Sequence, residues 1–133
     1  MSFRVLVVDD HDDVYRVVSR ALSKEGCEVQ RAATVDDALQ VLSSWNPDFI
    51  LSDYSMPEKS GGDLLRAVVN VRPDLIEHQR FVFLTGHPDL ARPYAEPYGL
   101  TVLEKPYRLD LLRRILLSRL GAGCSPESCD DMG

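Results

Sequence analysis

Charged and hydroxyl-bearing residues follow four short apolar runs in this chain of 133 residues. They are Asp9, Asp10, Asp53, Thr85 and Lys105. Three carboxylates that lie close together repel one another unless a cation intervenes. A hard divalent ion such as Mg²⁺, which prefers oxygen ligands and keeps several waters, is the simplest solution. With such an ion bound, one carboxylate could act as a nucleophile toward a phosphoryl group, and a nearby ammonium could neutralise the charge that develops.

The segments that must position these residues alternate between two patterns. Short apolar runs predict strands buried on both faces, and a more polar stretch predicts an edge strand. Between them lie amphipathic segments with apolar residues at helical spacing, one of which begins after a capping Thr34. The expected strands are Val5–Val8, Cys27–Ala33, Phe49–Leu51, Phe81–Leu84 and Leu100–Leu103.

This alternation, with short connections, predicts right-handed βαβ crossovers and an open parallel sheet covered by helices on both faces. In such a sheet, ligands bind beyond the carboxyl ends of the strands. Taken singly, Asp9 and Asp10 could merely cap a helix, and Lys105 could be an ordinary surface charge. Because all five polar residues follow strands, we expect them to converge at one edge of the sheet.

Composition limits the classes of function. The chain has 15 Lys and Arg against 21 Asp and Glu, a net charge of -6, which disfavours direct binding of nucleic acid. The longest apolar runs are too short for a membrane span, and no secretory signal is evident, so we expect a cytoplasmic protein. The three cysteines imply no disulfide framework. Zinc binding by Cys124 and Cys129 lacks further ligands nearby, so we expect reduced thiols.

Several of these motifs together resemble the receiver domain of two-component response regulators. The resemblance rests on Val7-Val8-Asp9-Asp10, Asp53-Tyr54-Ser55-Met56-Pro57, Thr85-Gly86 and Lys105-Pro106, and extends from residue 3 to about residue 120. It implies a flavodoxin-like (βα)5 three-layer sandwich with a five-stranded parallel sheet in the order 2-1-3-4-5. We expect the domain to span residues 1–120 and residues 121–133 to form a disordered acidic tail.

The resemblance also implies a role for each site residue. Asp53 matches the phosphoacceptor, which takes a phosphoryl group from a phosphohistidine of a sensor histidine kinase or a histidine phosphotransfer protein. Thr85 matches the hydroxyl that bonds the phosphoryl oxygen, and Lys105 matches the cation that pairs with the carboxylate and then with the phosphate. The Mg²⁺ ligands are expected to be Asp9, Asp10, Asp53 and the backbone carbonyl of Ser55. Pro106 matches a proline that a cis peptide bond typically precedes.

This sequence departs from the family pattern at two places. Val102 occupies the position three before Lys105, where the family usually has an aromatic residue whose rotamer follows the threonine. Pro93 lies within the expected fourth helix, which predicts that this helix is short, kinked or melted. His87 occupies a position that tunes the lifetime of the aspartyl phosphate in the family, but we expect it to be exposed and not catalytic. Arginines near the C-terminal half could contact an acidic partner or form a solvated face: Arg92, Arg108, Arg113, Arg114 and Arg119.

Other functions fit the sequence less well. A phosphatase of the haloacid dehalogenase type needs a second aspartate two residues after its nucleophile, where this chain has Ser55. A nucleotide-binding module needs a glycine-rich first turn, where this chain has Asp9-Asp10-His11. A receiver-like module that binds proteins without being phosphorylated stays open as the alternative. In either reading the domain is not a turnover enzyme, although a receiver assists its own phosphorylation and dephosphorylation.

Overall fold

A computed structural model describes residues 3–106 and 108–120 of the chain. Parallel strands form one sheet in the order β2-β1-β3-β4-β5, which confirms the predicted flavodoxin-like topology. The strands are β1 (Arg4–Val8), β2 (Glu28–Ala32), β3 (Phe49–Ser52), β4 (Phe81–Thr85) and β5 (Thr101–Glu104). The helices are α1 (Asp12–Ser23), α2 (Val35–Leu42), α3 (Gly61–Val71), α4 (Pro73–Glu77), α5 (Pro88–Ala95), the 3₁₀ helix η1 (Glu96–Tyr98) and α6 (Leu109–Leu120).

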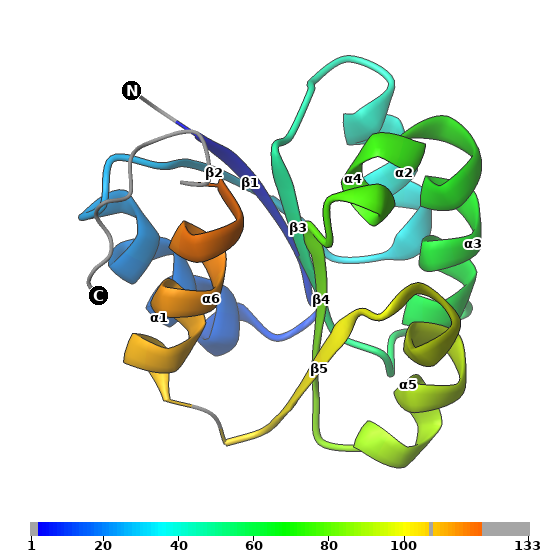
Figure 1. Cartoon of the computed structure of the whole chain (residues 1–133). Helices are drawn as coiled ribbons and strands as arrows, with labels where there is room; N and C mark the ends of the chain where they lie inside the picture. The colour runs from blue at the N-terminus through cyan, green and yellow to red at the C-terminus, as the bar shows by residue number, and fades with distance from the viewer. Residues whose placement is uncertain (1–2, 107, 121–133) are drawn as a thin grey trace.

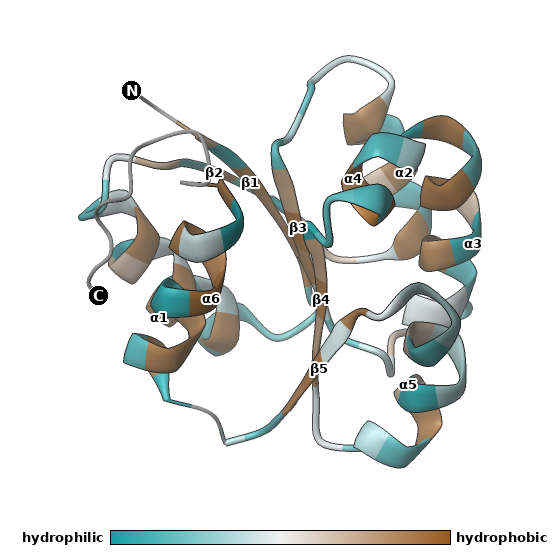
Figure 2. Ribbon diagram, in the orientation of Figure 1, coloured by the Kyte–Doolittle hydropathy of each residue, from teal (hydrophilic) through white to brown (hydrophobic). Residues whose placement is uncertain are grey.

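The helices cover both faces of the sheet, so the central strands contribute to two apolar cores. Helices α1 and α6 lie on one face, and α2 to α5 lie on the other (Figure 1). In β1, Val5 and Val7 pack in the core beneath α1 and α6, whereas Leu6 and Val8 pack in the core beneath the other helices. Alternate side chains of a strand point to opposite faces, which explains why all four positions are apolar. Figure 2 shows the same apolar character along the middle of the sheet.

Helix starts next to the sheet edge are set by local hydrogen bonds. Thr34 caps α2, as predicted, by accepting a hydrogen bond from the backbone N–H of Asp37 at 3.1 Å. Ser60 and Asp63 form a reciprocal capping box at the start of α3. These caps fix where each helix begins, and therefore the length of the loop between each strand end and its helix.

The segment between β3 and β4 contains one more helix than the sequence predicted. Pro73 ends α3 as expected, but it also begins the short helix α4, where a proline without an N–H is tolerated. The expected fourth helix is therefore α5, and the prediction that it is short is confirmed. Pro93 lies inside α5, which is followed directly by η1.

The structure bears on two further expectations. No helix among residues 3–106 and 108–120 is long and apolar enough to cross a membrane. The predicted tail, with Cys124 and Cys129, lies outside the described residues, and Cys27 is a buried free thiol.

Candidate functional site

The carboxyl ends of β1 and β3 bring the acidic residues together. Asp9 follows β1 and Asp53 follows β3, and the Asp53 N–H donates to the carbonyl of Val8 at 2.9 Å. Ligand atoms of Asp9, Asp10, Asp53 and His11 all lie within 4.8 Å of one another. Asp9 and Asp53 are 1% and 4% exposed, whereas 31% of the Asp10 side chain is exposed. The cluster is therefore buried on one side and open to solvent near Asp10.

The ammonium group of Lys105 faces the two buried carboxylates. Lys105 directly follows β5, and its Nζ lies 3.1 Å from Asp9 Oδ2 and 3.5 Å from Asp53 Oδ2. The Lys105 backbone N–H donates to the carbonyl of Thr85 at 2.8 Å, which fixes the start of this side chain against β4. The peptide bond between Lys105 and Pro106 is cis, as the resemblance to receiver domains implied.

Burial and the nearby charges act on Asp53 in opposite directions. Burial raises the pKa of Asp53 above its usual value, the Lys105 ammonium lowers this pKa, and the Asp9 carboxylate raises it. Backbone hydrogen bonds from Tyr54 and Ser55 also lower the pKa of Asp53, and the Tyr54 bond is 2.7 Å long. The net effect is a raised pKa of Asp53. The site therefore disfavours the ionised carboxylate, and a nearby cation would favour it.

Thr85 is buried at the end of β4, and Lys105 follows the end of the neighbouring strand β5. Its Oγ1 accepts a hydrogen bond from the backbone N–H of His87 at 2.9 Å, at the residue that precedes α5. Within the part of the chain that the structure describes, no hydrogen bond joins this hydroxyl to Asp53. Ser55 lies in the exposed loop after Asp53. His87 is exposed too, as expected.

His11 is a site residue that the sequence motifs did not indicate. Its Nδ1 lies 3.0 Å from Asp9 Oδ1 and 3.3 Å from Asp10 Oδ1. Its backbone N–H also donates to Asp9 Oδ1, at 2.9 Å. The available signal was its position directly after two aspartates, which places a ring at the mouth of the acidic cluster.

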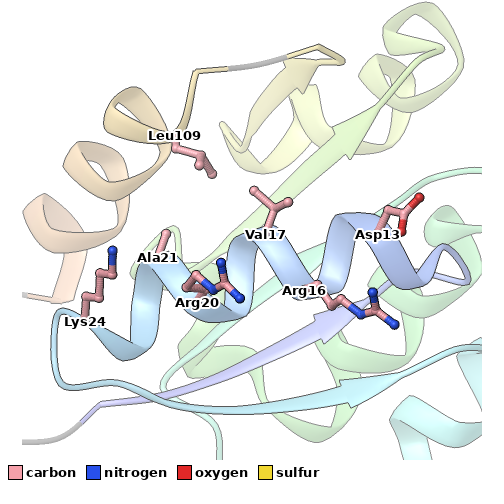
Figure 3. A pocket seen from close by; sticks show the side chains of 7 residues that line it. All are labelled: Asp13, Arg16, Val17, Arg20, Ala21, Lys24 and Leu109. Carbon is pink, nitrogen blue, oxygen red and sulfur yellow. The ribbon is translucent and has the colours of Figure 1, made fainter.

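The donor set fits a hard divalent cation. The cluster offers carboxylate oxygens from two strand ends, and oxygen is the ligand that Mg²⁺ prefers. A groove of about 470 Å³ along α1 has a different character (Figure 3). It is lined by Asp13, Arg16, Val17, Arg20, Ala21, Lys24 and Leu109. It contains one carboxylate and several cations, so it does not offer the chemistry of the strand edge.

The arginines near the C-terminal half are spread over several local contacts. Arg92 pairs with Asp89 at 2.9 Å and Arg108 pairs with Asp110 at 2.7 Å. Arg113 lies 3.4 Å from Glu25, across the gap to the end of α1. These exposed pairs favour the solvated-face interpretation for Arg92 and Arg108 over a dedicated acidic-partner site.

Comparison with known proteins identifies the family. The model of the response regulator receiver domain matches residues 5–117. The chain belongs to this family. The response regulator receiver protein CpdR of Brucella abortus is 32% identical over 115 residues, which cover 84% of this chain and 92% of that protein. The sporulation initiation phosphotransferase F of Bacillus subtilis is 27% identical, over 85% of this chain and 90% of that protein.

Longer relatives and solved structures agree with this assignment. The transcriptional regulator NtrC of Proteus hauseri is 34% identical, but the match covers 80% of this chain and only 22% of that protein. The chain thus spans about a fifth of that relative's length. The chemotaxis response regulator CheY4 of Vibrio cholerae superposes with a TM-score of 0.76 at 26% identity, covering 90% of this chain and 99% of that one. This chain is therefore a two-component receiver domain with an acidic pocket at its sheet edge.

Proposed function

We propose that this receiver domain is a phosphoacceptor switch in which Asp53 is the residue modified. The phosphoryl group comes from a phosphohistidine of a sensor histidine kinase or a histidine phosphotransfer protein. The observation that supports this proposal best is the position of the Asp53 carboxylate, 4% exposed and 3.5 Å from the Lys105 ammonium. Two relatives of this chain are named as a sensor kinase and a phosphotransferase, and both names fit a role in phosphoryl transfer.

The proposed reaction is a transfer between two nucleophiles. A carboxylate oxygen of Asp53 forms a bond to phosphorus while the bond from phosphorus to the histidine nitrogen breaks. The electron pair of that bond stays on the imidazole, which takes up a proton, and Asp53 becomes an acyl phosphate. Lys105, held near Asp53, would pair with the charge on the transferring group, and the Thr85 hydroxyl would bond one of its oxygens. Later hydrolysis, tuned from positions Ser55 and His87, would reset the domain without making it a turnover enzyme.

The acidic cluster is the proposed site of Mg²⁺. Asp9, Asp10, Asp53 and the backbone carbonyl of Ser55 would hold the ion, and their oxygen ligands fit its preference. When bound, Mg²⁺ supplies positive charge that stabilises the oxygens of a phosphoryl group. The protein's own contribution is to hold Asp53 buried and aligned through the Tyr54 N–H and the Lys105 ammonium.

We place this switch in the cytoplasm, with protein partners rather than nucleic acid. A buried free thiol at Cys27 is compatible with that reducing compartment. Adding a phosphate of about -2 charge at Asp53 would pull Lys105 and Thr85 toward it and change the partner-binding surface.

Incubation with acetyl phosphate and Mg²⁺, followed by intact mass spectrometry, tests the proposal. The wild-type chain should gain the mass of one phosphoryl group, and Asp53→Asn should gain none. Because the acidic residue Asp63 caps α3 away from the cluster, Asp63→Asn is a suitable control that should still be modified. Absence of any mass gain in wild-type protein that binds Mg²⁺ would instead favour the receiver-like module that is not phosphorylated.

A further inference from the structure

The position of the usual switch aromatic is filled by a small residue in this chain. Val102 pairs with Phe83 in the register of β4 and β5, and it is partly buried against the core beneath α2 to α5. A valine there has no ring whose rotation could follow the Thr85 hydroxyl. If phosphorylation of Asp53 changes the surface around α5, another contact must connect the two.

The residue after the phosphoacceptor has two direct links to it. The Tyr54 backbone N–H donates to Asp53 Oδ1 at 2.7 Å, and the Tyr54 carbonyl accepts from the N–H of Gly61 at 2.7 Å. These bonds fix the Tyr54 backbone relative to the carboxylate. The Tyr54 ring then packs edge-on against Phe83 with a centroid separation of 6.2 Å, and at 5.8 Å from the ring of Tyr94.

Tyr94 carries this contact into α5. Its ring is enclosed on other sides by α3, where the Arg66 guanidinium lies 5.3 Å from the ring centroid. A Cβ added to Gly62 would lie 2.7 Å from the same ring, so the ring fills the space above this glycine. Tyr94 therefore has little room to move toward α3, so the Tyr54–Tyr94 contact connects the site directly to α5.

Helix α5 is connected to the site through the residue before it and through Tyr94 near its end, and Ala91 and Ala95 pack in the core. The Thr85 hydroxyl accepts a hydrogen bond from His87, the residue before α5, and Tyr94 lies near the helix end. Pro93, inside the helix, has no N–H to donate to the preceding turn. A short helix that lacks an internal hydrogen bond needs such tertiary contacts to hold one position.

We propose that the contact between Tyr54 and Tyr94 holds α5 in the position of the unphosphorylated domain, and that this contact is lost when Asp53 is phosphorylated. The pair thereby takes the place of the missing aromatic at position 102. Two changes at the site act on it together. Conversion of the Asp53 carboxylate to an acyl phosphate removes its negative charge and so weakens the hydrogen bond that Oδ1 accepts from the Tyr54 N–H, and the Thr85 hydroxyl releases His87 when it bonds the phosphate. This inference rests on the proposed function of Asp53.

Beryllofluoride with Mg²⁺, a non-covalent mimic of the acyl phosphate, tests the inference. A contact present only in the unliganded state opposes binding of the mimic, so its removal strengthens binding. Tyr94→Leu should bind beryllofluoride about 2- to 10-fold more tightly by calorimetry, which corresponds to about 0.4–1.4 kcal/mol and the usual strength of an aromatic pair. In NMR spectra without the mimic, the α5 amide signals of Tyr94→Leu should already be displaced toward their positions in mimic-bound wild type.

Matched variants separate this effect from general disturbance. Tyr98→Leu removes an exposed tyrosine from the neighbouring 3₁₀ helix and should leave affinity and α5 signals unchanged. Tyr94→Phe keeps the ring and should stay close to wild type. Tyr54→Leu removes the same ring contact from its other partner and keeps the Tyr54 backbone, so it should act in the same direction as Tyr94→Leu. It also replaces Tyr94→Leu as the deciding variant if urea unfolding shows that Tyr94→Leu does not fold.

The outcomes distinguish this inference from the function on which it rests. If wild type binds beryllofluoride and the deciding variant binds it equally or more weakly, the Tyr54–Tyr94 contact does not hold α5 and the inference is wrong. If wild type does not bind beryllofluoride and is not modified by acetyl phosphate, the proposed role of Asp53 fails first.

Discussion

Removal of the Lys105 ammonium should destabilise the metal-free domain, and added Mg²⁺ should restore most of the lost stability. Lys105 lies 3.1 Å from Asp9 and 3.5 Å from Asp53, and both carboxylates are almost fully buried. At an effective dielectric constant of about 20, a unit charge pair at such distances attracts by about 5 kcal/mol. Desolvation of the ammonium offsets much of this attraction. Removing one partner of a buried ion pair typically costs about 3–5 kcal/mol, and 22% of the Lys105 side chain is exposed, so we expect about 3 kcal/mol for Lys105→Met.

The loss should depend on pH in a defined direction. The pKa of Asp53 is raised by burial and lowered by Lys105, so Lys105→Met should raise this pKa further. An acid whose pKa is higher in the folded state is favoured there only in its protonated form. The part of the deficit that comes from Asp53 should therefore be absent below the folded pKa of Asp53 in wild type, grow between that pKa and the higher folded pKa in Lys105→Met, and stay constant above both.

Urea unfolding from pH 3 to pH 8, with and without Mg²⁺, measures these effects. Mg²⁺ should restore most of the stability of Lys105→Met at neutral pH, because it supplies positive charge to the same carboxylates. Lys59→Met removes an exposed lysine that pairs with Asp36 at 2.8 Å, and it should leave the unfolding midpoint near that of wild type. A Lys105→Met deficit below about 1 kcal/mol, or one that is independent of pH and Mg²⁺, would refute the electrostatic account of the site.

Three further predictions concern the scaffold and the metal. Gly61→Ala should destabilise the domain by about 3 kcal/mol or more in urea unfolding, because the new Cβ would lie 2.4 Å from the Asp53 carbonyl oxygen. A loss under about 1 kcal/mol would contradict the close packing of Gly61 against that oxygen. Thr34→Ala should cost about 1 kcal/mol by the same measurement through loss of the cap to Asp37, and Thr34→Ser should recover most of it. In wild type, Mg²⁺ at 100 times its dissociation constant should add about 2.7 kcal/mol to the free energy of unfolding. Asp10→Asn should need a much higher Mg²⁺ concentration for the same gain. If wild type and Asp10→Asn gain stability at the same Mg²⁺ concentrations, Asp10 is not a ligand.

The sheet was predictable because its pattern is strong and redundant. Val5–Val8 is apolar at every position, and the structure uses alternate residues for two different cores. Helix α4 was not predictable from the same reasoning, because a proline after an amphipathic segment signals an end more clearly than a new beginning. Pro73 both ends α3 and begins α4, and only the packing of Leu75 and Ile76 in the core shows that a helix begins there.

The acidic cluster was predictable because topology alone brings the ends of parallel strands to one edge. The side-chain geometry was not. Spacing places Lys105 at that edge but cannot show that its ammonium lies closer to Asp9 than to Asp53. Spacing also gave no reason to select His11, whose ring reaches back to both aspartates from the residue before α1. Such contacts depend on rotamers and loop backbone, which periodicity does not determine.

The charge balance of the site explains why it can work as a switch. Asp9, Asp10 and Asp53 carry three negative charges when ionised and face one ammonium at Lys105, which leaves a deficit of two positive charges (3 − 1 = 2). A bound divalent cation would remove this deficit, and the proposed phosphorylation of Asp53 would restore negative charge at the same place. Since Asp9 is buried and Asp10 is partly exposed, the cluster is open to a cation from the side of Asp10. The groups next to the proposed phosphoryl charge are Lys105, Thr85 and Tyr54. The Thr85 hydroxyl contacts the residue before α5, and the Tyr54 ring contacts Tyr94 in α5.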